Sequence, residues 1–285
     1  MKSVLVTGVS SGIGLGTVRV LIGRGVRVFG SVRRQIDADR LQAELGEMFL
    51  PLIFDITDHE AVQRAAVQVR AALGGQRLSG LVNNAGVAVP APLAAQPIAD
   101  FRHQLEVNLV GPVIVTQAFL PLLGTDASLS GPPGRIVNIS SIGARLSPPF
   151  LAAYAASKAG LEALSDSLRR ELIPYGIDVL VVAPGSVNTG IADKSDDEVN
   201  HWAADPVYAT PVRRMSNNMK QGNQAGYGPE QLGEAIWTAL QTPRPRPVVR
   251  SAPGPEPLLA RVMMGVLPKR VLDKVLSRGV GLKRQ

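Results

Sequence analysis

The sequence of 285 residues lacks cysteine altogether, and only 4% of its residues are aromatic and 19% charged. Without cysteine the chain cannot form disulfides or cysteine-ligated zinc and iron–sulfur sites, which suits a reducing compartment, so we expect a cytoplasmic protein. No run approaches the ~18 consecutive apolar residues of a membrane-spanning helix. The three histidines are too scattered to indicate a metal site. The 45% of hydrophobic residues is enough for a core, which excludes disorder as the main state.

The positive charge of the chain is concentrated at its C-terminal end. The formal net charge is +7, and residues 257–285 carry seven basic side chains against one acidic side chain, or +6 of that total. The remaining residues are nearly neutral. A basic terminal tail is more typical of a solvated face or an electrostatic docking patch than of a protein that reads nucleic acid, so we expect no nucleic-acid partner.

Short apolar runs alternate with segments of helical period as far as about residue 183. This alternation is typical of a parallel sheet with helices on both faces, and six strands make a full Rossmann-type sheet. The predicted fold class is therefore α/β, with a single doubly wound parallel sheet. The first run is also too short for the core of a signal peptide. The predicted strands are Ser3–Thr7, Val26–Val32, Phe49–Phe54, Leu78–Val82, Arg135–Ile139 and Ile177–Ala183.

Helical periodicity is clearest from Tyr154 to Ile173, where leucines recur at spacings of three and four before Pro174 ends the run. The periodicity is lost over residues 186–228, which we interpret as an irregular substrate lid. No internal repeat or low-complexity tract divides the chain, so we expect one catalytic domain over residues 1–252.

Residues 253–285 are predicted to form a basic, amphipathic extension. Six prolines between residues 243 and 257 indicate an extended connector with one short edge strand at Val248–Arg250. Apolar residues on both sides of Pro268 recur at helical spacing, which predicts two short amphipathic helices. Their apolar faces need a partner. The chain's own domain is the first interpretation, and a membrane surface or a second subunit are the alternatives.

The first predicted strand leads into Thr7-Gly8-Val9-Ser10-Ser11-Gly12-Ile13-Gly14, and an amphipathic helix follows. Glycines let the backbone turn tightly and approach a pyrophosphate, while the start of the helix offers free N–H groups and the positive end of its dipole. A plain strand-to-helix turn is the alternative. The place of this loop between the first strand and the first helix of a βαβ series favours nucleotide binding.

The spacing Thr-Gly-x-x-x-Gly-x-Gly resembles the nucleotide loop of the short-chain dehydrogenase/reductase family. Other marks of that family follow in order, over about residues 3–190: Asp55, Asn83-Asn84-Ala85-Gly86, Asn108, Ser140-Ser141, Tyr154 with Lys158, and Pro184-Gly185-Ser186-Val187-Asn188-Thr189. Each mark is common by itself, but together they are specific. The cofactor-binding residues predicted from these marks are Gly8, Ser10, Ser11, Gly12, Ile13, Gly14, Arg33, Arg34, Asp55, Ile56, Asn84, Ala85, Gly86, Tyr154, Lys158, Pro184, Gly185, Val187 and Thr189.

Tyr154 and Lys158 lie four residues apart, so on one helix their side chains project from the same face. Hydride transfer to a carbonyl carbon requires a proton to move to the oxygen, and a free phenol with a pKa of about 10 is poorly matched to neutral pH. We expect the neighbouring ammonium of Lys158 to lower the pKa of Tyr154. The resemblance gives Lys158 a second role, which is to hold the ribose hydroxyls of the nicotinamide nucleotide.

Ser141 and Asn108 complete the predicted catalytic group. The Ser141 hydroxyl is expected to hydrogen-bond the substrate oxygen, with Ser140 as the alternative. Asn108 resembles the helical asparagine of the family whose backbone carbonyl holds a proton-relaying water, and a buried residue at a helix kink is the alternative. Asn83 and Asn138 are expected to tie neighbouring strands and loops together rather than to contact a ligand.

The choice of nucleotide is predicted from the residues after the second strand, where an acid would accept the ribose hydroxyls of NAD and a base would pair with the phosphate of NADP. Here the strand ends in Arg33-Arg34, and the nearest acids come several residues later. We therefore predict NADP(H) rather than NAD(H), with Arg33 as the main phosphate partner and Ser10 or Ser11 assisting. Ser11 occupies a position that is often basic in relatives that use NADP. Two solvated arginines are the alternative interpretation.

These observations predict an NADP(H)-dependent oxidoreductase that acts on an apolar alcohol or carbonyl compound of steroid, retinoid or fatty-alcohol type. Hydroxysteroid and retinol dehydrogenase-like members of the family carry a C-terminal extension over the substrate cleft, and the extension here would form an apolar roof. A ketoacyl-type reductase and a non-catalytic NADP(H)-binding regulator are the alternatives. The resemblance also implies a homodimer or homotetramer. Basic helices that dock on anionic lipid would place the protein at a membrane surface.

Overall fold

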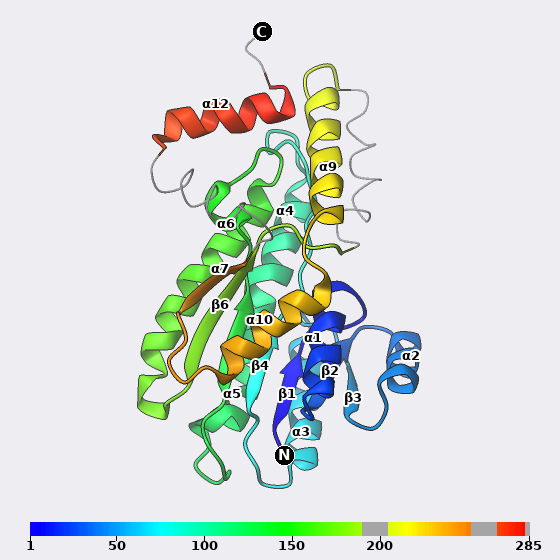
Figure 1. The fold of residues 1–285 in the computed structure, drawn as a ribbon, viewed down its shortest axis with the longest axis vertical. Coiled ribbons are helices and arrows are strands. Elements are labelled where there is room, and N and C mark those ends of the chain that lie inside the picture. The colour runs from blue at the N-terminus through cyan, green and yellow to red at the C-terminus, as the bar shows by residue number, and fades with distance from the viewer. Residues whose placement is uncertain (190–204, 252–266, 283–285) are drawn as a thin grey trace.

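The computed structural model describes residues 1–189, 205–251 and 267–282. Seven parallel strands form one sheet in the order β3-β2-β1-β4-β5-β6-β7, with helices on both faces (Figure 1). The predicted α/β class is confirmed, and each of the six predicted strands lies within two residues of its predicted ends. The predicted edge strand is β7. The strands are β1 (Ser3–Val6), β2 (Arg27–Val32), β3 (Phe49–Ile53), β4 (Gly80–Asn83), β5 (Arg135–Ile139), β6 (Asp178–Pro184) and β7 (Val248–Ser251).

Helices fill the connections between the strands. Local sequence explains their ends: at α3 the side chain of Asp58 accepts a hydrogen bond from the N–H of Ala61, and Gly74 ends the helix in a left-handed conformation. The predicted helix Tyr154–Ile173 is α7, which ends just before a short turn that contains Pro174. The helices up to this point are α1 (Gly12–Gly23), α2 (Gln35–Leu45), α3 (His59–Leu73), α4 (Ile98–Leu105), α5 (Gly111–Leu120), α6 (Gly143–Leu146) and α7 (Ala152–Glu171).

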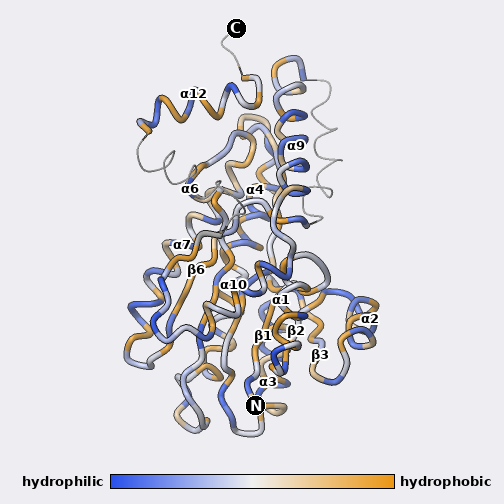
Figure 2. The backbone as a smooth tube through the Cα atoms, in the orientation of Figure 1, coloured by the Kyte–Doolittle hydropathy of each residue, from blue (hydrophilic) through white to orange (hydrophobic). Residues whose placement is uncertain are grey.

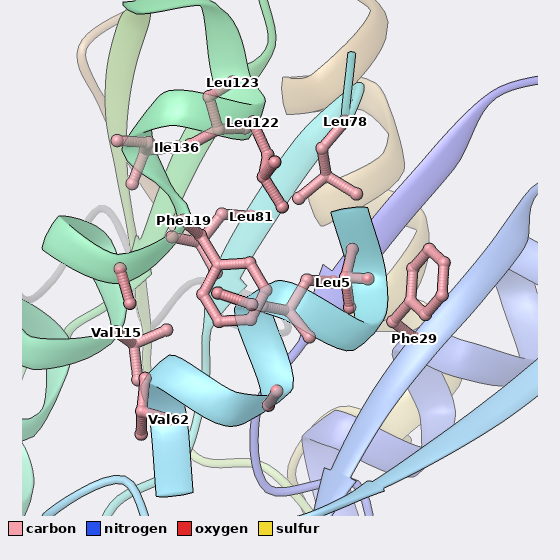
Figure 3. Packing of buried hydrophobic residues seen from close by; sticks show 14 of the residues in the cluster. Leu5, Phe29, Val62, Leu78, Leu81, Val115, Phe119, Leu122, Leu123 and Ile136 are labelled. Atoms are coloured by element: carbon pink, nitrogen blue, oxygen red, sulfur yellow. The ribbon is translucent and has the colours of Figure 1, made fainter. Parts of the chain in front are cut away.

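Two large clusters of buried apolar side chains lie on the two faces of the sheet. Strand residues alternate between them, so Leu5 belongs to one cluster and Val4 and Val6 to the other. In the first cluster Phe119 of α5 packs among residues of the strands and of α3, with Leu81 close to it (Figure 3). Hydrophobic residues are concentrated along the strands, whereas the helices mix both kinds (Figure 2). These clusters fix the strand ends from which the site is built.

The helical stretch Ile98–Thr125 is long and apolar enough to cross a membrane by length and composition alone. Its mean hydropathy reaches 1.6 over the most apolar window, but 56% of that window is buried inside the protein. Phe119 and Leu123 are fully buried in this stretch. It behaves as a core helix in the part of the chain that the structure describes.

The interpretation of residues 186–228 as irregular is wrong in part, because α9 (Ala209–Gln224) is a helix of 16 residues. Residues 190–204 of the predicted lid lie outside the described part, as does the first predicted helix of the extension. The second predicted helix is confirmed as α12 (Lys269–Val280). The described residues also form α10 (Pro229–Gln241), and α9 and α12 lie beyond the carboxyl ends of the strands (Figure 1).

Candidate active site

The glycine-rich loop joins β1 to α1 through a backbone path that only glycine allows at two points. Gly8 has a φ of +69°, and a Cβ on it would lie 2.8 Å from the Cα of Ala85. A Cβ on Gly14 would lie 2.3 Å from the carbonyl oxygen of Gly8. The loop therefore holds a tight turn that brings the first N–H groups of α1 to its surface.

Side chains from the neighbouring strands hold this loop in place. The amide of Asn84 donates to the carbonyls of Thr7 and Gly8 at 2.8 and 3.1 Å, and the N–H of Gly8 donates to the hydroxyl of Ser31 at 3.0 Å. Asn84, predicted to bind the cofactor, thus has its amide bonded to the loop itself. The first turn of α1 holds no acidic residue. A tight glycine cradle at a helix N-terminus without a carboxylate fits the pyrophosphate of a dinucleotide.

Three of the four predicted catalytic side chains meet in one cavity of about 350 Å³ at the carboxyl ends of the strands. Tyr154 and Lys158 reach it from α7, and Ser141 reaches it from the end of β5. The ammonium of Lys158 donates to the carbonyl of Ile139 at 2.8 Å and lies 5.9 Å from the centre of the Tyr154 ring. Ser141 and Tyr154 line this cavity together, and the Ser141 side chain lowers the pKa of the Tyr154 phenol. This arrangement places a phenol, a hydroxyl and an amine around one point.

The expectation that the pKa of Tyr154 is lowered is wrong in this structure. Burial raises the pKa of the Tyr154 phenol, and the Ser141 side chain lowers it by less. Burial also lowers the pKa of Lys158 to about 8. The reason for the difference is that both groups are removed from water, while the amine is directed to the Ile139 carbonyl.

The structure distinguishes Ser141 from its neighbour Ser140. Ser140 also lines the cavity, but its buried hydroxyl is directed to α7, where it lies 3.2 Å from a carboxylate oxygen of Glu162 and 3.4 Å from the carbonyl of Lys158. The Ser141 hydroxyl lines the cavity and accepts from the N–H of Gly143 at 3.0 Å. The hydroxyl of Ser141 is thus not taken up by α7, and its contact with a substrate oxygen stays a prediction.

Asn108 is buried in a π-helical turn, Glu106–Val110, between α4 and α5. Its side-chain oxygen accepts from the N–H of Val87 at 2.8 Å, and its amide donates to the Val87 carbonyl at 2.8 Å and to Ser157 at 3.1 Å. These bonds give Asn108 a structural role at a helix irregularity, which was the alternative interpretation. The water-binding role of its carbonyl stays a prediction. π-Helical turns are frequent at functional sites.

Asn83 and Asn138 tie neighbouring strands together, as predicted. The Asn83 amide donates to the Asn138 side chain at 2.8 Å and to Thr116 at 3.1 Å, and the Asn138 amide donates to Ser165 at 2.8 Å. All of these bonds are buried and lie between β4, β5 and the helices that cover them. The two asparagines therefore support the sheet from which the cavity is built.

The two arginines after β2 have different surroundings. Arg34 makes two hydrogen bonds to Asp37, at 2.7 and 3.1 Å, and these bonds lower the pKa of the Asp37 carboxyl. Arg33 is 73% exposed and lies 4.0 Å from Asp55, whose carboxylate also accepts from the N–H and hydroxyl of Thr57. Arg33 thus has the freer guanidinium of the pair.

Sequence reasoning missed several residues of the site. Arg40 of α2 donates to the carbonyl of Ser10 at 2.9 Å, and its position one turn after Asp37 was the one signal for it. One face of α9 also closes the cavity, through Met215, Asn218, Met219 and Asn223. The other predicted cofactor residues on the cavity wall are Ile13, Asn84, Gly86, Pro184, Gly185, Val187 and Thr189. Ile56 instead lies in the core.

The family model for short chain dehydrogenases matches residues 2–200. The chain belongs to the short-chain dehydrogenase/reductase family. A relative in Ornithobacterium rhinotracheale named NADPH-dependent 3-dehydrocapnine reductase is 35% identical and covers 98% of this chain and 97% of its own length. Mouse (Mus musculus) retinol dehydrogenase 16 is 32% identical, covering 96% of this dehydrogenase and 87% of its own length.

Solved structures agree with this family membership. A short-chain dehydrogenase from Streptomyces avermitilis superimposes with a TM-score of 0.77 at 30% identity, over 98% of this chain and 97% of the other. A serine dehydrogenase in its closed form, complexed with NADP+, gives a TM-score of 0.73 at 26% identity, over 88% of this chain and 94% of its own. This short-chain dehydrogenase is thus an oxidoreductase with the Rossmann-type fold of its family.

Proposed function

We propose that this dehydrogenase transfers a hydride between NADP(H) and an apolar alcohol or carbonyl compound. The observation that carries the proposal is the convergence of Ser141, Tyr154 and Lys158 in one cavity that also touches the glycine loop through Ile13. When bound, the nicotinamide nucleotide supplies or accepts the hydride. The chain's own residues must then orient the carbonyl and move one proton.

Ser141 and Tyr154 would hold the substrate oxygen between their hydroxyls and polarise the carbonyl. In the reducing direction the Tyr154 hydroxyl donates its proton to the oxygen, and in the oxidising direction the tyrosinate accepts it. The raised pKa of Tyr154 favours the protonated phenol, which is the form that donates a proton. Lys158 would hold ribose hydroxyls and, when protonated, favour the tyrosinate.

The preference for NADP(H) rests on charge at the end of β2. Arg33 follows this strand and has an exposed side chain. Arg34 pairs with the nearby Asp37 carboxylate, whose negative charge would otherwise repel a phosphate. The relative from Ornithobacterium rhinotracheale is named as NADPH-dependent, and the serine dehydrogenase structure contains NADP+. Both names support the same nucleotide for this chain.

The apolar wall of the cavity supports a lipid-like substrate. Leu146, Leu151, Met215 and Met219 line it, and methionines adapt to irregular apolar shapes. A steroid, a retinoid or a fatty alcohol fits this chemistry, and a relative is named retinol dehydrogenase. We propose that residues 186–228 act as a substrate lid of the catalytic domain, residues 1–252, and that the extension, residues 253–285, forms a roof.

The outer face of α12 supports a contact with an anionic membrane surface. Val271 and Val275 are 42% and 46% exposed, and four cations accompany them on this helix: Lys269, Arg270, Lys274 and Arg278. Exposed apolar residues among cations bind anionic lipid. Sedimentation with phosphatidylserine vesicles is expected and should weaken with salt, whereas equal sedimentation with neutral vesicles would contradict the proposal.

A homodimer or homotetramer, as implied by the family, is tested by light scattering.

The reaction is tested by following NADPH and NADH consumption with ketosteroids, retinal, medium-chain aldehydes and a sugar as control. Turnover of an apolar carbonyl with NADPH is expected, and it should be lost in Tyr154→Phe. Turnover of the sugar alone, or a preference for NADH, would contradict the substrate class or the nucleotide. Tight NADPH binding without turnover of any compound would instead favour a regulator.

A further inference from the structure

Arginines and carboxylates gather where β2 runs into α2, next to the glycine loop. The N–H of Val9 donates to the carbonyl of Ser31 at 3.0 Å, so the loop lies against the end of this strand. The members of this cluster are Arg19, Arg33, Arg34, Asp37, Arg40 and Glu44. Each arginine has different carboxylate partners, at different distances, and this determines how much of its positive charge is neutralised.

Each of the two carboxylates of the cluster is held most closely by an arginine other than Arg40. Arg34 bonds to Asp37 at 2.7 and 3.1 Å, while Arg40 stays 3.7 Å from the same carboxylate. Arg19 bonds to Glu44 at 2.7 and 3.2 Å, while Arg40 stays 3.5 Å from it. The charge of Arg40 is therefore only partly neutralised.

Arg40 makes its closest polar contact with the loop, and its two carboxylate neighbours, Asp37 and Glu44, lie farther away at 3.7 and 3.5 Å. Its guanidinium donates to the carbonyl of Ser10 at 2.9 Å, although its side chain remains 46% exposed. A guanidinium has five N–H donors, and the bond to the Ser10 carbonyl uses only one of them. Ser10 lies in the glycine loop, one residue before Ser11. A cation from α2 is thus brought to a loop that has no basic residue of its own.

We propose that Arg40 is a second cation for the 2′-phosphate of the nucleotide, and that Arg34 is a positioning residue that keeps the Asp37 carboxylate from opposing that phosphate. This inference rests on the proposed use of NADP(H). Arg33 and Arg40 would approach the phosphate from β2 and α2. Arg34 acts indirectly: without it the Asp37 carboxylate would be left with Arg40, 3.7 Å away, and would offset the charge that Arg40 offers to the phosphate.

The proposal predicts effects on NADP+ that NAD+ does not share. Arg40→Met should weaken NADP+ binding by about tenfold or more, because a charge-assisted hydrogen bond is lost, and should change NAD+ binding by less than about twofold. Arg34→Met should weaken NADP+ binding by about threefold to tenfold through the freed charge of Asp37. Adding Asp37→Asn to Arg34→Met should restore most of that loss, since the negative charge freed by the loss of Arg34 is then removed.

Isothermal titration calorimetry on the full chain measures these affinities without turnover. The titrants are NADP+, NAD+ and the fragment 2′,5′-ADP, which reports the phosphate without the nicotinamide. Arg64→Met is the matched control, because Arg64 is a 66% exposed arginine paired with Glu60 on α3 at 3.6 Å. It should leave the binding of all three titrants unchanged.

The outcomes separate this inference from the proposed function. Equal weakening of NADP+ and NAD+ in Arg40→Met would show that Arg40 only shapes the loop, and no weakening would show that it does not meet the phosphate; either result overturns its role. A double variant no better than Arg34→Met would overturn the role of Arg34. If the parent chain binds neither dinucleotide, the proposed function itself fails.

Discussion

The nucleotide half of the site and its substrate half are built in different ways. The nucleotide half rests on paired strands, on two large buried clusters, and on a glycine loop in which a Cβ at Gly8 or Gly14 would clash with neighbouring atoms. The substrate half rests on a small cluster that joins distant segments, namely Ala91, Phe150, Leu151, Val212, Met215 and Val280. Backbone geometry thus fixes the part that would bind a common nucleotide. A few side-chain contacts hold the part that would meet a particular substrate.

The largest effect is expected at the junction of the two halves. Tyr154→Phe removes the proton donor and should lower kcat by about 10²- to 10⁴-fold, while the Kd for NADPH stays within about twofold. Steady-state kinetics and calorimetry on the same preparation measure both. Tyr175→Phe, which removes a phenol that is 47% exposed and outside the cavity wall, serves as a matched control. A Tyr154→Phe enzyme with undiminished kcat would exclude this phenol as the acid.

Gly14→Ala tests the rigidity of the nucleotide half. The new Cβ would lie 2.3 Å from the Gly8 carbonyl and 2.6 Å from the Asn84 amide, so the loop must shift. NADPH binding should weaken by more than about tenfold, and the free energy of unfolding should fall by about 1–3 kcal/mol. Gly23→Ala is the control, since a Cβ there meets no atom within 4 Å. Normal NADPH affinity in Gly14→Ala would show that the loop adapts.

Lys158 gives a pH dependence of stability whose sign follows from its pKa. Burial lowers this pKa from 10.5 to about 8, so between these values the unfolded chain binds more protons than the folded one, and stability should rise with pH. Lys158→Met should raise the free energy of unfolding at pH 7 by about 1–2 kcal/mol and flatten that rise. Urea unfolding at about pH 7 and about pH 9.5 compares the two proteins. Parallel pH profiles would mean that the amine is solvated.

A Val→Ala substitution in each half gives the smallest effects on stability and compares the two halves directly. Val28 and Val280 are both buried, with 0% and 4% of their surface exposed. Val28→Ala should cost about 2–3 kcal/mol of global stability, whereas Val280→Ala should cost less than about 1 kcal/mol and mainly speed hydrogen exchange in α12. Equal global losses would show that α12 and the sheet unfold as one unit.

The strands and the glycine loop were predictable because local rules govern them. Buried parallel strands such as β6 are apolar over nearly their whole length, here from Val179 to Pro184, and the loop glycines reflect a backbone path. The helix α9 was missed because its apolar stripe is narrow, with Val212, Met215 and Met219 among polar residues. Their spacing of three and four was the signal that could have revealed it.

The finer chemistry of the site could not be predicted because it depends on contacts between distant segments. The raised pKa of Tyr154 follows from burial under the folded chain, while the sequence shows only that Lys158 is near. The bond from Arg40 to Ser10 spans 30 residues, and the pairing of Arg34 with Asp37 decides which arginine is free. Motifs identify which residues gather, and packing decides their protonation and their partners.

Hydride transfer from NADPH to an apolar carbonyl can be followed with deuterium. NADPH labelled with deuterium at the transferring position of nicotinamide C4 is incubated with the enzyme and a substrate from the panel, and the alcohol product is examined by mass spectrometry. We expect one deuterium on the carbinol carbon of the product, and no labelled product from Tyr154→Phe. A product formed without deuterium, or equal labelling by the variant, would contradict it.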